Sequence, residues 1–572
     1  MTDTAGLNRQ QAVMIAQTAI TLGVEHAVLS PGARNTPLVL ALHDMQEAGW
    51  PIQLHSIIDE RAAGFFALGI ARRTNKPVLL TCTSGSAGTH YYPAVVEASE
   101  GQVPLLLITA DRPEELQNRA APQTMNQAHL FGSHVRFFAH LKSPINDENM
   151  GSTATVVTTA IQAALGPAPG PAHLNAAFRK PLWAPGDTPP PPVEISPMVR
   201  TPVRAIDSDI DRLLAEVHGK SGLIVMGPDP SGRIAPSTVL RLSEFLGWPI
   251  LADPVTRLRY GVEGPVIHHH DVLLRSPHFR EILNPDIVIT LGGTSSSKPL
   301  SQTLSDTPCI HIGGTGRLQD PWHSVQWTLS ADVDTVVEAL NPVQHTPTSP
   351  DWVRRWIHAD QCAQQAIQQV CSTTLWEGSV AHTMVNSLPP NTLLRLASST
   401  PIRDVDSFSI QSEHALTVSS NRGVNGIDGL IATSLGEAVA HDGPVAILSG
   451  DLSFLHDVGA LASVPRPHQA VVITVVDNGG GGIFGFLPMA EHPTGFKPWF
   501  VTPHNHDLSR MCTGFGIDAV QVDSIEQYTR TLKLCIHEPG LHVIHIPIDR
   551  AASTQQHFDA FAQITNAIEA TL

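Results

Sequence analysis

Short apolar runs, each followed by glycine-rich or polar residues, recur along the whole chain and constrain its fold more than any other feature. Examples are PLLLIT at 104–109, GLIVM at 222–226 and AVVITVV at 470–476. Runs of this length suit buried strands and are far shorter than the roughly 18 residues of a membrane helix. The stretches between them, such as 61–73, have the pattern of helices. This alternation predicts an α/β protein with parallel sheets flanked by helices, in which ligands bind beyond the carboxyl ends of the strands.

Two proline-rich stretches divide the chain. The first is WAPGDTPPPPV at 183–193, and the second is NPVQHTPTSP at 341–350. Consecutive prolines cannot sit in a helix or donate to a sheet, so they favour extended linkers. A chain of 572 residues has room for three domains of ordinary size. We therefore expect three α/β domains, at 1–185, 195–340 and 350–572.

The charge balance argues against two classes of partner. With 35 Lys and Arg against 52 Asp and Glu, the formal net charge is −17, whereas nucleic-acid and polybasic membrane binders need excess positive charge. The six cysteines form no C-x-x-C pair, and the polar start MTDTAGLNRQQ lacks the apolar core of a secretory signal. These features predict reduced thiols, a cytoplasmic location and no membrane span.

The strongest chemical signal lies in the last third of the chain. One apolar run ends at Gly450-Asp451, and the next ends at Asp477-Asn478, followed by four glycines at 479–482. Mg²⁺ prefers oxygen ligands that it shares with phosphate, and these strand ends would supply a carboxylate, an amide and a backbone carbonyl. The glycines would let the backbone approach a diphosphate, whose charge a following helix start would favour. Alternatively, Asp451 caps a helix and the glycines only turn the chain.

A second signal is Glu60 in HSIIDERAAGFFALGIARR at 55–73, where a strand turns into a helix. Glu60 is either a partly buried carboxylate that hydrogen-bonds a cofactor ring or an ordinary acidic residue favoured by the helix dipole. The hydroxyl-rich TSGSAGT at 83–89 fits a turn against a ligand, or equally a plain connection.

Four arginines stand in loops that follow strands. They are Arg34 in SPGARNTPL, Arg112 in ITADRP, Arg403 shortly after Ser399, and Arg422 in NRGVNG. In a chain poor in cations, several such guanidinium groups suggest recognition of carboxylates. Each one alone is more often a surface ion-pair partner.

The run HHHD at 268–271 looks like a metal cluster, but side chains of consecutive residues point in different directions and rarely bind one ion. We expect these histidines to be structural or exposed. The sequence contains no GKS or GKT phosphate loop and no G-x-S-x-G nucleophile motif.

These residues together carry a resemblance to a known family. Glu60 within DERAAGFFALG, with Gly450-Asp451 and with Asn478 and its glycines, is similar to the thiamin diphosphate enzyme superfamily. Five stretches, SPGARNTPL, ITADRPEEL, NRGVNGIDG, GDLSFLHD and NGGGGIFGFLP, further resemble its carboligases of menaquinone biosynthesis. The likeness runs from about residue 10 to the C-terminus in the same order and is weakest in the middle domain.

The resemblance implies a pyrimidine-binding, a central and a diphosphate-binding domain, in that order. It implies a transferase that decarboxylates 2-oxoglutarate and adds the succinyl unit to isochorismate in conjugate fashion. Thiamin diphosphate and Mg²⁺ (or Mn²⁺) would be the cofactors. The cofactor would lie between the first domain of one subunit and the third of another, so a homodimer or homotetramer is expected. The other partners would be small dicarboxylate substrates, with neither nucleic acid nor a membrane span.

The resemblance also implies roles for single residues. Glu60 would hydrogen-bond the cofactor's pyrimidine and act in catalysis, and the metal would be held by Asp451, Asn478 and the Gly480 carbonyl. Besides Glu60, Asn478 and Gly480, the cofactor-binding positions would be Ser84, Gly85, Gln123, Ser449, Gly450, Leu452, Ser453, Gly481, Ile483 and Phe484. The substrate-binding positions would be Arg34, Arg112, Gln123, Lys298, Ser399, Arg403, Arg422, Ile427, Ile483, Phe484 and Leu487.

Two positions depart from the family pattern. Ala33 stands where a serine is usual before the arginine, and Pro299 follows Lys298 where an arginine is frequent. Two alternatives also stay open. One is another thiamin diphosphate decarboxylase or carboligase, for example one acting on pyruvate, a monocarboxylate that needs fewer arginines. The other is a nucleotide-binding α/β protein without catalysis.

Overall fold

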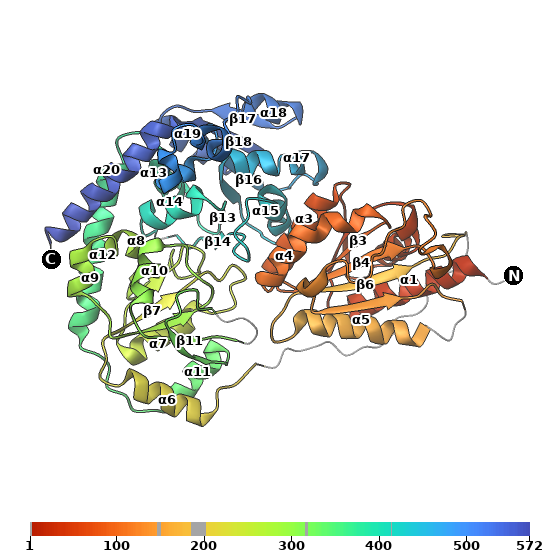
Figure 1. Cartoon of the computed structure of the whole chain (residues 1–572), viewed down its shortest axis with the longest axis horizontal. Coiled ribbons are helices and arrows are strands. Elements are labelled where there is room, and N and C mark those ends of the chain that lie inside the picture. The colour runs from red at the N-terminus through yellow and green to blue at the C-terminus, as the bar shows by residue number, and fades with distance from the viewer. Residues whose placement is uncertain (1–2, 146–149, 185–201, 315–318, 413, 572) are drawn as a thin grey trace. The chain divides into compact units, whose positions relative to one another are not determined.

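The structure is a computed structural model that describes residues 3–145, 150–184, 202–314, 319–412 and 414–571. Within these ranges the strands form three six-stranded sheets, and every strand pair is parallel. Helices flank each sheet (Figure 1), so the predicted α/β class with parallel sheets is confirmed. Most of the first proposed linker lies outside the described residues, whereas the second joins helix α11 to helix α12.

The first sheet has the strand order β2-β1-β3-β4-β6-β5. Helices α1, α2 and α5 pack together on one face. Helices α3 and α4 cover the other face, opposite α1 and α5 in Figure 1. The central strands β3 and β4 are buried along their whole length, which explains why their residues are mostly apolar. The strands are β1 (His26–Ser30), β2 (Gln53–Ser56), β3 (Val78–Cys82), β4 (Leu105–Asp111), β5 (Phe137–Leu141) and β6 (Pro171–Ala177). The helices are α1 (Thr4–Thr21), α2 (Thr36–Glu47), α3 (Glu60–Thr74), α4 (Tyr92–Glu100) and α5 (Met150–Leu165), with short 3-10 turns η1 (Ala33–Asn35), η2 (Ser86–Tyr91), η3 (Glu114–Leu116) and η4 (Gly132–His134).

The second sheet has the order β12-β11-β10-β7-β8-β9, in which the chain reverses direction across the sheet between β7 and β10. This is the doubly wound arrangement of dinucleotide-binding folds. Its strands are β7 (Gly222–Met226), β8 (Ile250–Ala252), β9 (Val266–Ile267), β10 (Ile287–Leu291), β11 (Cys309–Ile312) and β12 (Val325–Leu329). Its helices are α6 (Asp207–Val217), α7 (Pro236–Leu246), α8 (His270–Leu273), α9 (Pro277–Ile282), α10 (Lys298–Ser305) and α11 (Val333–Leu340).

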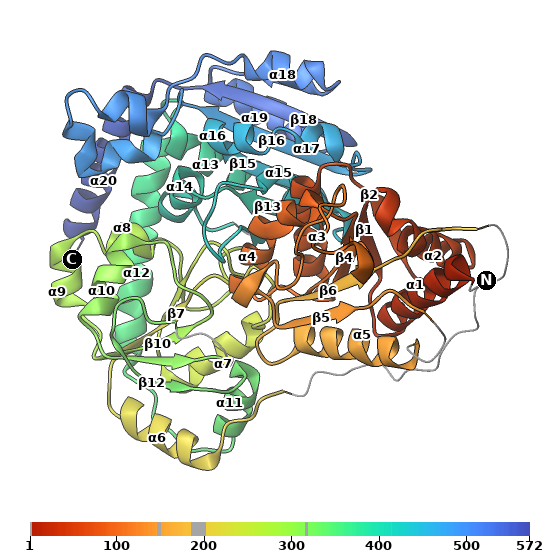
Figure 2. The ribbon, with the colours of Figure 1, turned by 45° about the vertical axis from the view of Figure 1, so that its right-hand side comes forward.

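The third sheet, with the order β14-β13-β15-β16-β18-β17, repeats the pattern of the first sheet strand for strand. Figure 2 shows strands β13, β15, β16 and β18 of this sheet, which are neighbours in that order. The strands are β13 (Leu393–Leu396), β14 (Thr417–Ser419), β15 (Val445–Gly450), β16 (Ala470–Asp477), β17 (Asp518–Gln521) and β18 (Gly540–Pro547). The helices are α12 (Pro350–Cys371), α13 (Glu377–Ser387), α14 (Thr400–Phe408), α15 (Leu430–Val439), α16 (Asp451–His456), α17 (Ala460–Ser463), α18 (Leu508–Gly514), α19 (Ile525–Cys535) and α20 (Arg550–Glu569), with η6 (Gly482–Phe486), η7 (Pro488–Glu491) and η8 (Lys497–Val501).

The chain divides into two compact units, and the division does not follow the sequence order. The first unit holds Met1–Thr201, Asn421–Asp442 and His456–Pro467; the second holds Pro202–Ser420, Gly443–Leu455 and His468–Leu572. Helix α15 therefore belongs with α3 in the first unit. The two helices meet at glycines, because a Cβ on Gly69 would collide with the Thr433 carbonyl and one on Gly436 with the Phe66 carbonyl.

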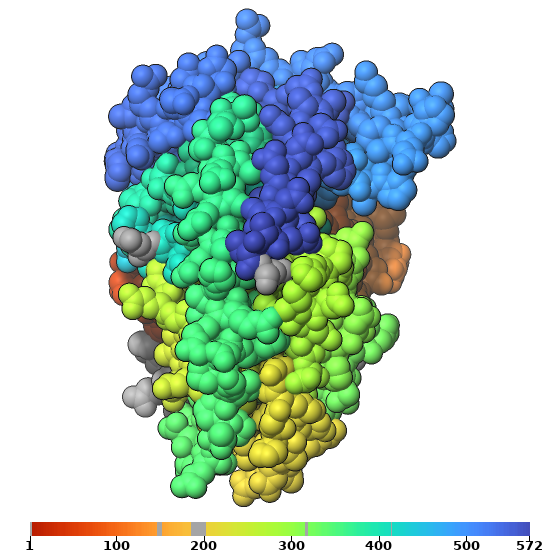
Figure 3. Space-filling model, turned by 90° about the vertical axis from the view of Figure 1, so that its left-hand side faces the viewer, coloured from red at the N-terminus to blue at the C-terminus, as the bar shows by residue number. Residues whose placement is uncertain are grey.

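In the second unit, the long helices α12 and α20 lie side by side on one face (Figure 3). Trp352 and Trp356 of α12, and Ile564 of α20, pack into one core with Leu223 of the second sheet. In the described part of the chain, no helix combines the length and apolar character that crossing a membrane requires. All six cysteines are free thiols.

Candidate active site

Asp451 lies at the carboxyl edge of the third sheet, next to the loop that carries Asn478. Strand β15 pairs with β16 so that Gly450 lies opposite Val476, which brings the residues after both strands to the same edge. Oδ2 of Asp451 accepts a hydrogen bond of 2.6 Å from the Gly480 amide and lies 3.0 Å from Nε2 of His504. Asp451, Asp477 and His504 each offer a potential ligand atom, and these atoms lie within 4.8 Å of one another.

The amide of Asn478 is oriented by its neighbours. Its Nδ2 donates a hydrogen bond of 2.6 Å to Oε1 of Glu377, whereas its Oδ1 is buried and accepts no hydrogen bond from the described residues. Gly480 has φ +137°, and a Cβ there would collide with the Val501 carbonyl. The Gly480 carbonyl accepts from the Gly482 amide at 2.9 Å and has a second lone pair. The Oδ1 of Asn478 is thus buried and without a partner among the described residues. It stands on the loop whose Gly480 amide bonds Asp451, and an oxygen donor there fits a hard cation such as Mg²⁺.

Electrostatics at this edge depend on burial and on paired carboxylates. Burial, together with the nearby charge of Asp477, raises the pKa of Asp451 to about 6. Burial also acts on Asp477, but hydrogen bonds from His545 and the Gly479 amide outweigh it and hold the pKa of Asp477 below its usual value. The site therefore contains acidic groups that gain from a nearby cation.

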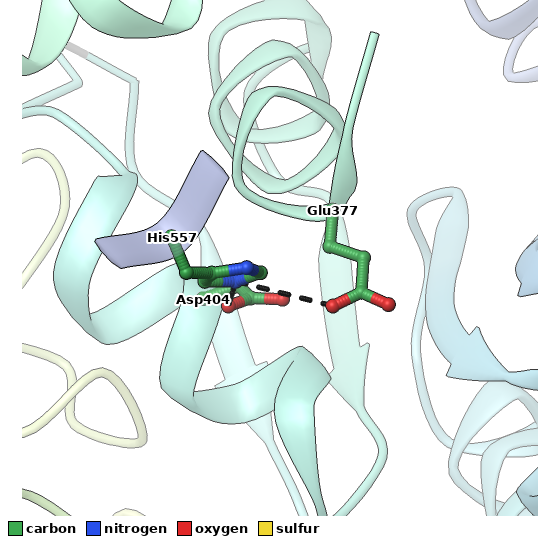
Figure 4. A group of neighbouring side chains, drawn as sticks. All are labelled: Glu377, Asp404 and His557. Carbon is green, nitrogen blue, oxygen red and sulfur yellow. Dashed lines mark hydrogen bonds and ion pairs between the residues drawn. The ribbon is translucent and has the colours of Figure 1, made fainter. Parts of the chain in front are cut away.

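Behind Asn478 lies a buried group of Glu377, Asp404 and His557 (Figure 4). Nε2 of His557 is 2.9 Å from Oδ1 of Asp404 and 3.9 Å from Oε2 of Glu377. Burial and the charge of Asp404 raise the pKa of Glu377 to about 7. Although burial disfavours a charged imidazole, the two carboxylates outweigh it and raise the pKa of His557.

The other positions expected to bind the cofactor in the last third surround the same edge. Ser449 and Ser453 are buried, and the Leu452 amide donates to Oδ1 of Asp451 at 2.7 Å. Ile483 and Phe484 are half-buried in η6, and Leu487 is exposed just after it. The helix expected to follow the glycines is wrong in kind: η6 is a five-residue 3-10 turn, which ends at Leu487, extended before Pro488.

Glu60 opens α3 in the first unit, as the sequence predicts. The helix is capped by Asp59, whose side chain accepts from the Arg61 amide, and Glu60 itself is half-buried. Strand β2 ends four residues earlier, at Ser56. A carboxylate at the first residue of a helix, just beyond the end of a strand, can hydrogen-bond a ligand while it stays partly exposed to water.

A second cluster in the first unit brings together Ser84, Gly85, Arg112 and Gln123. Nη1 of Arg112 donates to the Ser84 hydroxyl at 2.6 Å, and its Nη2 lies 3.5 Å from Oε1 of Gln123. Gly85 has φ +88°, and the backbone of Gln123 lies 3.4 Å from where its Cβ would be. The Gly85 amide donates to Oε1 of the buried Gln127 at 2.9 Å. Gln127 was not singled out by the sequence, since a lone glutamine in a loop carries no local signal.

Arg34 is more buried than its loop position suggested. It lies in η1, and its Nη1 donates to the Phe178 carbonyl at 2.6 Å. Burial, followed by the nearby charge of Arg112, lowers the pKa of Arg34 to about 10. The two guanidinium groups are therefore close enough to repel each other, with the carboxylate of Asp111 as a nearby opposing charge.

Arg422 and Ile427 lie in the loop before α15, in the first unit, and both are half-buried. The loop is fixed by Glu97, which accepts hydrogen bonds from the Gly423 and Val424 amides at 2.9 and 2.8 Å. Glu97 and Arg72 form a buried ion pair at 3.2 Å. No local pattern marks Glu97, because its partners in the loop are 326 and 327 residues away.

The remaining expected substrate residues are in the second unit. Ser399 is the N-cap residue of α14, with φ +77°, and its carbonyl accepts from Nη1 of Arg403 at 2.5 Å. Arg403 is exposed one turn into that helix. Lys298 is exposed at the start of α10, on the second sheet and not the third.

The three histidines of HHHD are structural, and the alternative that they are exposed is wrong. His268, His269 and His270 are all buried, and Nδ1 of His269 is 3.0 Å from Oδ1 of Asp360. Burial lowers the pKa of His268 and of His270 to about 3.

Comparisons with known proteins agree with this arrangement. Residues 10–130 match the family model "Thiamine pyrophosphate enzyme, N-terminal TPP binding domain". Residues 197–396 match "Middle domain of thiamine pyrophosphate", and residues 411–546 match "Thiamine pyrophosphate enzyme, C-terminal TPP binding domain". Together with the three parallel sheets, these matches define the class as that of the thiamine pyrophosphate (thiamin diphosphate) enzymes.

The chain is also similar along its whole length to curated relatives named 2-succinyl-5-enolpyruvyl-6-hydroxy-3-cyclohexene-1-carboxylate synthase. The relative from Listeria monocytogenes is 34% identical over 575 residues, covering 96% of each chain. A relative from Haloarcula marismortui is 35% identical, and the match covers 93% of each chain. A relative from Bacillus cytotoxicus is also 35% identical, and the match covers 95% of this chain and 94% of the relative. The chain belongs to the 2-succinyl-5-enolpyruvyl-6-hydroxy-3-cyclohexene-1-carboxylate synthase family.

Proposed function

We propose that the protein decarboxylates 2-oxoglutarate and joins the remaining succinyl unit to isochorismate, in menaquinone biosynthesis. The products are CO₂ and 2-succinyl-5-enolpyruvyl-6-hydroxy-3-cyclohexene-1-carboxylate, and the enzyme is a transferase. The observation that carries this proposal is the likeness to synthases of that name over 96% of both chains. Thiamin diphosphate, when bound, supplies the stabilisation of negative charge that the decarboxylation requires.

The third sheet holds the diphosphate and its metal in this proposal. Asp451, Asn478 and the Gly480 carbonyl are the protein ligands of Mg²⁺ or Mn²⁺. This assignment is supported by the buried Oδ1 of Asn478, which has no partner in the described part of the chain, and by the hydrogen bond between Gly480 and Asp451. The exposed or half-buried side chains of Ile483, Phe484 and Leu487 form an apolar wall that keeps water from the reacting carbon.

In the first unit, Glu60 hydrogen-bonds N1′ of the cofactor's pyrimidine and holds or releases a proton at that atom. Its place at the start of α3, half-buried and oriented by the helix, supports this role. Ser84, Gly85 and Gln123 line the pyrimidine side, which the contacts of Arg112 with Ser84 and Gln123 support.

Carboxylates of the two substrates are bound by arginines. Arg34 and Arg112 act together, supported by the electrostatic effect of Arg112 on Arg34. Arg403 with Ser399, Arg422 with Ile427, and Lys298 complete the proposed set. Both substrates carry two carboxylates, so a set of several planar guanidinium groups suits them.

The proposal includes the assembly and the domain limits. The pyrimidine-binding domain is 1–185, the central domain 195–340 and the diphosphate-binding domain 350–572. Active sites form at the interface between subunits of a homodimer or homotetramer. A cytoplasmic location is supported by six free thiols, which are typical of a reducing compartment.

The test is an assay with purified protein, thiamin diphosphate, Mg²⁺, 2-oxoglutarate and isochorismate. Loss of isochorismate absorbance is followed, and the product is identified by its mass. We expect consumption only when all four additions are present. Pyruvate in place of 2-oxoglutarate should give no product. If the protein turns over pyruvate but not 2-oxoglutarate, the proposed substrates are wrong and the assignment of thiamin diphosphate stands. Failure to bind thiamin diphosphate would overturn the proposal.

A further inference from the structure

The carboxylate of Glu377 connects Asn478 to a buried group of charges that no proposed role uses. Glu377 is the first residue of α13 and is 6% exposed. Its Oε1 accepts the 2.6 Å hydrogen bond from Nδ2 of Asn478, and its Oε2 lies 3.9 Å from Nε2 of His557. Figure 4 shows one carboxylate oxygen facing His557 and Asp404 and the other directed away from them.

This contact determines which atom of the Asn478 amide is free. Because Oε1 of Glu377 accepts from Nδ2 at 2.6 Å, the amide presents its NH₂ to Glu377. The oxygen is thereby turned to the other side of the amide group, where it is buried and has no partner among the residues that the structure describes. Turning the amide over would oppose Oδ1 to Oε1 and lose the hydrogen bond, which is costly in a buried site.

The surroundings of the amide leave it little freedom. A Cβ on Gly482 would collide with Nδ2 of Asn478, so the chain passes close to the amide at that point. Nη1 of Arg550 donates to the carbonyls of Asn478 and Gly479 at 3.1 and 3.2 Å, which fixes the backbone.

Glu377 is itself held in place by His557. Nδ1 of His557 is 2.7 Å from the Ser553 carbonyl, and its Nε2 is 2.9 Å from Asp404. The edge-to-face ring of Trp376, the residue before Glu377, lies 4.8 Å from the imidazole. The histidine thus lies between two carboxylates and is fixed on the remaining sides.

We propose that Glu377 is a positioning residue that turns Oδ1 of Asn478 toward the divalent metal of the cofactor. The inference rests on the proposed metal role of Asn478. Loss of a partner that orients a metal ligand from behind typically costs about 10–100-fold in metal affinity. His557 and Asp404 act one step further away, by holding Glu377.

The first experiment titrates the protein with Mn²⁺ at fixed thiamin diphosphate and follows unbound Mn²⁺ by electron paramagnetic resonance. In Glu377→Gln, the new amide can present its own NH₂ to Asn478, which lets Oδ1 turn away from the metal. We expect Mn²⁺ affinity to fall by about 10–100-fold. Asp360→Asn is the matched control, because Asp360 is a buried carboxylate beside a histidine in the same unit. It should leave Mn²⁺ affinity unchanged.

The second experiment reverses the hydrogen bond. Asn478→Asp alone places two carboxylates against each other, and we expect weaker Mn²⁺ binding although aspartate is an equally good ligand. The double variant Glu377→Gln with Asn478→Asp restores one donor and one acceptor, with a carboxylate oxygen left for the metal. It should bind Mn²⁺ more tightly than either single variant. A residue that only supports the fold would not produce this rescue.

The outcomes separate the inference from the proposed function. If Asp451→Ala abolishes Mn²⁺ binding while Glu377→Gln binds normally, the positioning role is wrong and the metal site stands. If Asp451→Ala binds Mn²⁺ normally, the metal site itself is wrong. If Glu377→Gln does not fold, Asn478→Asp decides alone: affinity equal to or above that of the unsubstituted protein overturns the inference.

Discussion

The amide of Gly480 donates a hydrogen bond of 2.6 Å to Oδ2 of Asp451. The loop after β16 is thereby attached to the carboxylate after β15. The bond requires close approach of the backbone, and a Cβ at Gly480 would collide with the Val501 carbonyl. Asp451 and the glycine loop after β16 are the two parts of the proposed metal site, and this hydrogen bond holds them together without a metal ion.

Asp451→Ala removes the carboxylate on which this arrangement depends. We expect affinity for thiamin diphosphate in the presence of Mg²⁺ to fall by more than about 100-fold, because loss of a mere supporting partner already costs 10–100-fold. Isothermal titration calorimetry measures the dissociation constant. An unchanged value in this variant would refute the metal assignment of Asp451.

Glu60→Gln keeps the shape of the side chain and removes its charge. We expect turnover to fall by at least about 100-fold, because proton transfer assisted by a placed carboxylate contributes at least that much. Circular dichroism should be unchanged, since Glu60 is half-buried at the end of a helix. The control is Glu47→Gln, at the exposed end of α2. Near-normal turnover in Glu60→Gln would exclude the catalytic role.

Gly436→Val tests the close packing of α3 against α15. The added side chain would meet the Phe66 carbonyl, which is backbone and cannot rotate away. We expect the free energy of unfolding to fall by about 3 kcal/mol, as for other overpacked sites, measured as a lower urea midpoint. Gly514→Ala, where a Cβ meets nothing within 4 Å, should leave the midpoint almost unchanged. Equal midpoints for the two variants would contradict the packing.

Asp457 predicts a pH dependence of stability. Burial raises its pKa to about 7, above the value of roughly 3.9 in an unfolded chain. The folded state therefore holds a proton that the unfolded state releases, so this contribution to stability falls as pH rises from about 4 to 7. Asp457→Asn removes the titration and keeps an oxygen that can accept from the Ala432 amide.

Relative to the unsubstituted protein, Asp457→Asn should gain about 2 kcal/mol in the free energy of unfolding between pH 5 and 7.5. Urea unfolding at the two pH values measures this difference. If the variant and the unsubstituted protein differ by the same free energy of unfolding at both pH values, Asp457 does not have the raised pKa that its burial requires.

Patterns local in the sequence predicted much of the fold. The ends of β15 and β16 at Gly450 and Asp477 follow from apolar runs that stop at polar residues, and the start of α3 follows from the change after Asp59. These patterns work because a parallel strand that is buried on both faces favours apolar residues at most of its positions. The roles of the site residues stay predictions.

Contacts between distant residues could not be predicted. Glu377 is 101 residues from Asn478, and one glutamate at a helix start has no feature that marks its partner. Burial of the histidines at 268–270 likewise depends on packing and on Asp360 of α12. The 3-10 turn η6 in place of a regular helix depends on local backbone angles, which composition alone does not specify.

The fate of the carbons of 2-oxoglutarate tests the central claim most directly. Two reactions are run with isochorismate, thiamin diphosphate and Mg²⁺, one with 2-oxoglutarate labelled with ¹³C at carbon 1 and one labelled at carbon 5. The account predicts label from carbon 1 in CO₂ alone and label from carbon 5 in the isochorismate adduct, detected by mass spectrometry. Label from carbon 1 in the adduct, or labelled CO₂ without any adduct, would contradict it.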